Sequence, residues 1–168
     1  RIGMLVKEGA QTPEQKALIR KHLEKFCGLY TGMSSRLEEF VDLFPIHPSY
    51  IDVFNKLYLI ENRHILKNIS TTIKDIFDTN VPENAPGIIS FDNYWPAIKS
   101  NGLLKSDPTI SRVVGASQQL EDIIVRAFPK PAYKPMAMQI IYALSVHRLT
   151  TNGLDVQFGM TAENLKDD

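Results

Sequence analysis

Apolar residues recur every three or four positions along most of this chain, which predicts a mainly helical protein. Between the helices lie short polar stretches rich in proline, glycine and asparagine. The pattern predicts a multi-helix bundle of seven or eight helices. The expected helices cover residues 13–26, 36–43, 49 to about 59, 63–77, 92–100, 108–128 and 135–149, with a last one beginning after residue 161.

Several of these helices begin with residues that cap a helix well. Thr12-Pro13-Glu14-Gln15 has the spacing of a capping box with proline at the first helical position. Asp107-Pro108 has the same cap chemistry, and Thr161 can cap the last helix. Ser34 or Ser35 is the expected cap of the helix 36–43. These starts are predicted from local chemistry alone.

Proline-containing breaks divide the chain. Phe44–Pro48 ends one helix, and His47 between its two prolines is read as a structural turn residue. The three prolines of residues 128–135 make the best linker, so we expect a helical region over 1–128 and a second module over 129–168. Short strands are expected at 88–91 and 154–158. A helix, a short strand and a further helix are typical of the start of a winged-helix-like segment.

The helix 63–77 has two faces. Its isoleucines form one stripe, and Arg63, Lys67 and Lys74 form a second, basic stripe. Arg63 lies near the helix start, where a cation opposes the helix dipole, and an arginine fork there can bind a phosphate. The competing interpretation is a solvated basic face paired with Glu61 or Asp75. Arg63 and Lys67 are therefore candidates for sensing a nucleotide.

A second group of basic residues, Arg126, Lys130 and Lys134, surrounds Phe128 and Tyr133 in the proline-rich linker. Such a patch can contact a nucleic-acid backbone. The alternative is an ordinary polar loop. These three residues are the candidates for nucleic-acid binding.

Composition narrows the function classes. Nineteen basic and nineteen acidic residues give a net charge of zero, which argues against a generally basic nucleic-acid binder. The single cysteine, Cys27, cannot form an internal disulfide, so a cytoplasmic location is expected. No apolar run reaches the length of a membrane span. No phosphate-binding loop, metal-ligand spacing or catalytic triad signature occurs in the sequence, so neither a metal site nor catalytic residues are predicted.

Four segments carry a family resemblance. Leu43–Tyr50, Tyr133–Ala137, Ala143–Thr151 and Gly159–Asp168 together resemble the large P-loop ATPases of bacterial phage-resistance loci, the BREX-type ATPase family. The resemblance extends from about residue 12 to residue 168. Because the chain begins at Arg1 and stops within an expected helix, we expect a fragment of a longer polypeptide.

The resemblance implies a helical region that follows a nucleotide-binding core, as the lid does in AAA+ proteins. ATP and Mg²⁺ would be bound by the parent protein, and this fragment would hold no cofactor. Residues 61–66 look similar to the start of a lid helix whose arginine reaches the γ-phosphate, although the usual Gly-Asp before Arg63 is missing.

The expected function is that of a non-catalytic fragment that couples ATP binding and hydrolysis to conformational change. Its expected partners are the rest of the parent chain and other defence-complex subunits. The alternative is a helical or winged-helix-like adaptor that binds DNA or a partner protein.

Overall fold

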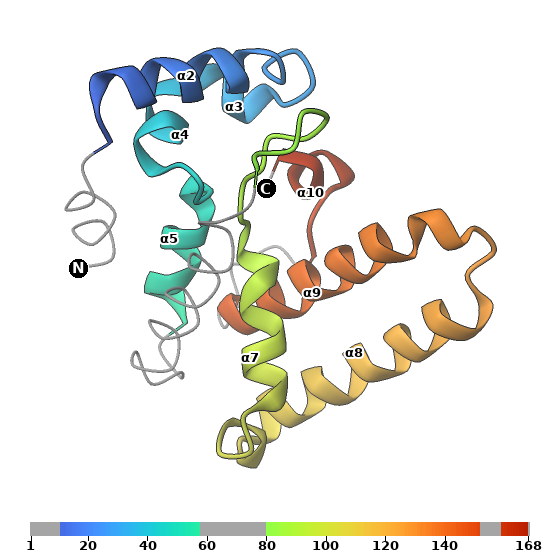
Figure 1. The fold of residues 1–168 in the computed structure, drawn as a ribbon. Coiled ribbons are helices and arrows are strands. Elements are labelled where there is room, and N and C mark those ends of the chain that lie inside the picture. Colours follow the sequence, from blue (N-terminus) through green and yellow to red (C-terminus); the bar gives the residue numbers. More distant parts are fainter. Residues whose placement is uncertain (1–10, 58–79, 152–158, 168) are drawn as a thin grey trace.

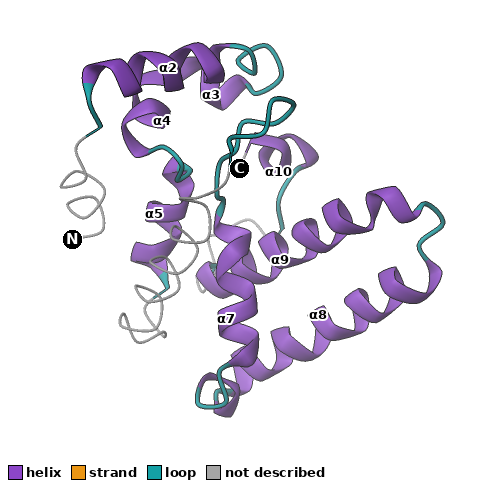
Figure 2. Ribbon diagram, in the orientation of Figure 1, coloured by secondary structure: helices purple, strands orange, loops and turns teal. Residues whose placement is uncertain are grey.

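A computed structural model describes residues 11–57, 80–151 and 159–167. Within these ranges the protein is mainly helical, and Figure 2 shows helices joined by loops. The only β-pairing among the described residues is an isolated parallel bridge between Ile46 and Ile89. The α-helices are α2 (Pro13–Glu24), α3 (Thr31–Ser35), α4 (Leu37–Leu43), α5 (Pro48–Lys56), α7 (Trp95–Ser100), α8 (Pro108–Ala127), α9 (Lys134–Thr150) and α10 (Ala162–Asp167) (Figure 1).

The first three described helices pack around a small apolar cluster. Its members come from the inward faces of α2, α3 and α4 and from the turn after α2. Burial of these side chains holds the three short helices together, because none of them is long enough to be stable alone. The buried members are Leu23, Phe26, Met33, Phe40 and Val41.

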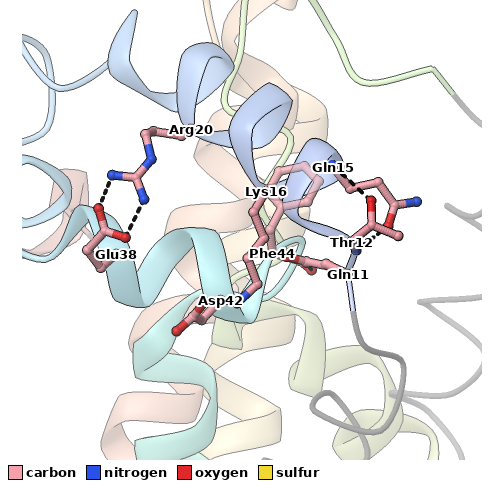
Figure 3. Close-up of polar contacts among 8 residues, drawn as sticks. All are labelled: Gln11, Thr12, Gln15, Lys16, Arg20, Glu38, Asp42 and Phe44. Atoms are coloured by element: carbon pink, nitrogen blue, oxygen red, sulfur yellow. Dashed lines mark hydrogen bonds and ion pairs between the residues drawn. The ribbon is translucent and has the colours of Figure 1, made fainter.

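Polar side chains join α2 to α4 outside that cluster (Figure 3). The Arg20 guanidinium donates to both carboxylate oxygens of Glu38, and Lys16 Nζ lies 2.6 Å from an Asp42 oxygen. Because these ion pairs are exposed to water, they contribute little to the free energy of unfolding. Their main effect is on which faces of α2 and α4 lie against each other.

The Phe44–Pro48 break connects this cluster to a larger one. The Phe44–Pro45 peptide is cis, and the chain then runs beside residue 89, with the His47 N–H donating to the Ile89 carbonyl at 2.9 Å. The larger cluster collects side chains from α5, α7, α8 and α9 and from the residues just before α7. Its fully buried members include Ile46, Tyr50, Tyr94, Trp95, Ile98, Ile110 and Val146.

Helices α8 and α9 form an antiparallel hairpin, joined by the short 3-10 turn Pro131–Tyr133 (Figure 1). Asp107 caps α8, accepting the N–H groups of Thr109 and Ile110 at 2.7 and 3.1 Å. In the C-terminal half of α8, Glu121 pairs with Lys99 of α7 and also accepts the Ser117 hydroxyl.

Several sequence predictions are confirmed. Thr12 and Gln15 form the expected capping box, Asp107 caps α8, and Thr161 accepts the Asn164 N–H at 3.1 Å. Trp95 is a fully buried core residue. The expected mainly helical bundle is therefore the observed fold class.

Other local predictions are wrong. The expected strand at 88–91 is only the bridge at Ile89, because its single neighbour is the Pro45–His47 turn rather than a second strand. Ser34 and Ser35 belong to α3, so α4 begins after Arg36 without a side-chain cap. The helix after the proline break begins at Pro48 instead of Ser49.

Two predictions concern residues outside the described ranges. The two-faced helix 63–77 and the strand 154–158, on which the winged-helix-like expectation depends, both lie there. The expected boundary after residue 128 falls in the turn between α8 and α9. Val146 of α9 lies in the same cluster as Ile46 and Trp95, and the two-module division stays a prediction.

No helix in the described ranges is long and apolar enough to cross a membrane.

Candidate functional site

The two nucleotide-sensing candidates, Arg63 and Lys67, lie outside the described residues. Their surroundings therefore add nothing for or against contact with a phosphate, and their role stays a prediction.

The three nucleic-acid candidates lie at the α8–α9 turn, and each makes a local contact there. Lys134 Nζ donates to the Val125 carbonyl at 2.7 Å, near the C-terminal end of α8. The Lys130 ammonium lies 5.6 Å from the centre of the Tyr133 ring. Arg126 donates to the Asp122 carbonyl at 3.2 Å. Lys130 and Lys134 thus make contacts at the turn, Arg126 makes its contact within α8, and nucleic-acid binding stays a prediction.

The described residues form a groove of about 380 Å³. It is lined by residues of α9, the segment 85–93, α3 and α10, and Figure 1 shows α10 between α3 above and α9 below. Its lining combines apolar side chains, several of them from α9, with polar side chains from α9, the segment 85–93 and α10. Its lining includes Tyr30, Met33, His47, Asp92, Asn93, Met136, Gln139, Ile140, Ala143, Leu165, Lys166 and Asp167.

All four segments that carry the family resemblance contribute to this groove. His47 comes from the first segment, Met136 from the second, Ala143 from the third, and Leu165 to Asp167 from the fourth. These segments are up to about a hundred residues apart in the sequence, and only the fold brings them to one surface.

His47 is a buried residue of the groove lining. Its Nδ1 accepts the Ser49 N–H at 3.1 Å, which caps α5. Because Nδ1 is the acceptor, the neutral ring carries its proton on Nε2. Nε2 is buried and has no hydrogen-bond partner, although the backbone of Asp167 lies near enough to favour a charged ring. Burial outweighs that influence and lowers the pKa of His47 to about 4.

Asp92 provides a second titrating group at the groove. Burial raises the pKa of its carboxyl to about 6, although hydrogen bonds from the backbone of residues 92 and 93 and from the Asn93 side chain oppose that rise. Among the described residues no lysine, arginine or histidine forms an ion pair with Asp92. A carboxylate that is partly removed from water and has no cationic partner is a common feature of binding sites.

The groove offers no complete catalytic apparatus. His47 and Asp92 both line it, whereas the Ser49 hydroxyl, 2.6 Å from His47 Nδ1, does not belong to the lining. Within the described ranges no three His, Cys, Asp or Glu side chains lie close enough together to hold a metal ion. A lining of apolar side chains with a few polar groups suits binding more than chemistry.

Sequence reasoning did not identify this site. His47 was read as a turn residue and Asp92 only as a residue at the start of the helix 92–100, and both readings describe the local backbone only. The signal that was available was the resemblance itself, because its segments come from three separate parts of the chain: residues 43–50, α9 and residues 159–168.

Over the described residues the protein is a mainly helical domain with a groove formed by residues of α3, α9, α10 and the segment 85–93. The chain matches the family described as DUF6079 second domain over residues 12–168, and it therefore belongs to that family. No curated protein and no solved structure matches the chain.

Proposed function

We propose that this chain is a non-catalytic helical domain of a large P-loop ATPase of the BREX phage-defence type. In that role it couples ATP binding and hydrolysis in the parent protein to conformational change. The groove between α9 and α10 is the surface through which it contacts the rest of the assembly.

One observation carries the proposal. The four segments that resemble the ATPase family come from three separate parts of the chain, two of them sharing α9, and each contributes residues to the same groove. Residues that resemble a family only because they fill a core would be spread over the interior. Further support comes from the family description as a second domain, which suits a part of a longer protein.

The test is ATP hydrolysis by the full-length parent, with wild type compared with Arg63→Ala. Arg112→Ala is the matched control, because Arg112 is an exposed arginine of α8 outside the groove. If Arg63 reaches the γ-phosphate, its loss lowers turnover by about a hundredfold or more, while Arg112→Ala leaves turnover unchanged.

The chain itself is the second control in that experiment. It is expected to show no ATP hydrolysis above background. Turnover by the purified chain would contradict a non-catalytic role, and unchanged turnover of the Arg63→Ala parent would contradict nucleotide sensing by this region.

A further inference from the structure

We propose that the groove between α9 and α10 binds a basic peptide segment of a partner protein subunit, with a lysine or arginine on Asp92 and aliphatic side chains on the apolar face of α9. The proposal takes its site from the proposed function. Its test is binding by this chain alone, so that either proposal can fail without the other.

The acidic side chains in the lining favour a positively charged occupant of the groove. Asp92 and Asp167 both line it, and Asp92 has no ion pair among the described residues. The one cation in the lining, Lys166, lies with its ammonium 6.0 Å from the centre of the Tyr30 ring, a cation–π contact. An incoming ammonium or guanidinium would give the partly buried Asp92 carboxylate a cationic partner, which no described residue provides.

The exposed apolar face of α9 favours an aliphatic side chain next to that cation in the bound peptide. Met136 and Ile140 lie one helical turn apart on α9, and 61% and 39% of their surfaces are exposed. Ala143 continues the same face of the helix towards the core. Methionine adapts to varied apolar side chains, which suits a surface that receives a peptide. The volume of about 380 Å³ lies at the lower end of the range for ligand sites, enough for a few side chains.

The experiment is fluorescence anisotropy with a labelled peptide of alternating leucine and lysine, titrated with the 168-residue chain. The same peptide with glutamate in place of lysine is the control probe. We expect saturable binding of the lysine peptide, binding at least about tenfold weaker for Asp92→Asn, and no binding of the glutamate peptide. Asp52→Asn, an exposed aspartate of α5 outside the groove, is the matched control and keeps wild-type affinity.

A second groove variant keeps the proposal testable if Asp92→Asn does not fold. Met136→Lys places a cation on the exposed apolar face of α9 and is expected to weaken the same peptide by about tenfold through repulsion and lost apolar contact. Leu120→Lys makes the same change on α8 at a residue that is 49% exposed and outside the groove, and it should leave affinity unchanged.

Three results would overturn the proposal. They are no saturable binding of the lysine peptide, equal affinity of wild type and both groove variants, and competition by lysine amide as strong as by the peptide. The last result would make the occupant a free amine.

Discussion

At the scale of single residues, His47 and Asp92 make the stability of this protein depend on pH in opposite directions. The pKa of His47 falls from 6.5 to about 4 on folding, so its contribution is complete above pH 6.5 and is lost as the pH falls towards 4. The pKa of Asp92 rises from 3.8 to about 6, so its contribution is present below pH 3.8 and is lost as the pH rises through 6. Between pH 4 and 6 the two effects largely cancel.

The variant Asp92→Asn should separate the pH effect of Asp92 from that of His47. At pH 7 the variant no longer leaves a carboxylate half-buried without a cation, so its free energy of unfolding should exceed that of wild type by about 1 kcal/mol. Between pH 6.5 and 4 it should lose stability more steeply than wild type, because only the His47 effect remains. Urea unfolding across that pH range measures both. A variant less stable than wild type at pH 7 would show that the Asp92 charge is stabilised in the fold.

The sequence is informative at this scale only where a residue acts on its own backbone. The roles of Thr12, Gln15, Asp107 and Thr161 follow from spacing, because a cap and its N–H groups lie within three residues of each other. The burial of Asp92 depends on α9 and α10, which follow it by more than forty residues. No local pattern contains that information.

At the scale of elements, the pair between Lys99 and Glu121 links α7 to α8. The Glu121 side chain is 9% exposed and that of Lys99 is 26% exposed, so removal of one partner leaves a charge largely hidden from water.

We therefore expect Lys99→Met to lower the free energy of unfolding at pH 7 by about 2 kcal/mol. Adding Glu121→Gln should recover much of that loss, because the amide removes the charge and still accepts the Ser117 hydroxyl. Thermal and urea unfolding of the two single variants and the double variant give the coupling energy. Purely additive effects would mean that the pair does not hold α7 to α8.

The α8–α9 turn contains the second prediction at this scale. Lys134 caps the C-terminal end of α8 and Lys130 lies over Tyr133, so the double variant Lys130→Ala with Lys134→Ala should lower the free energy of unfolding by about 1 kcal/mol. Circular dichroism during heating measures the change. Duplex DNA binding that falls steeply with salt in wild type and is absent in the double variant would instead favour the DNA-binding alternative.

Helices could be predicted well from this sequence, because proline, glycine and cap residues mark their ends. The extent of α2, α8 and α9 follows from the 3.6-residue pattern with shifts of one or two residues. The short helix α3 was missed, since Thr31–Ser35 has too few residues for a period to show. The run 88–91 has strand composition, but a strand also needs a neighbour, and pairing is not a local property.

At the scale of the whole molecule, two apolar clusters meet at the Phe44–Pro48 segment. Phe44 packs against the smaller cluster, whereas Ile46 belongs to the larger one. Because three consecutive residues connect both clusters, we expect the chain to unfold as one cooperative unit.

The single tryptophan allows a direct test, because Trp95 lies in the larger cluster and Leu23 in the smaller. Leu23→Ala removes a fully buried side chain and should cost about 3 kcal/mol. The urea midpoint measured by Trp95 fluorescence should then shift as far as that measured by far-ultraviolet circular dichroism. A fluorescence midpoint that stays in place would show that the clusters unfold separately.

The single cysteine makes it possible to measure the distance between the two clusters. Cys27 packs on the smaller cluster, is partly exposed, and is the chain's one thiol, while Trp95 is its one indole. A thiol-reactive dye at Cys27 that accepts energy from Trp95 would therefore turn the unmodified sequence into a spectroscopic ruler between the two clusters. No cysteine or tryptophan has to be introduced by mutation to measure whether a bound partner changes the distance between the clusters.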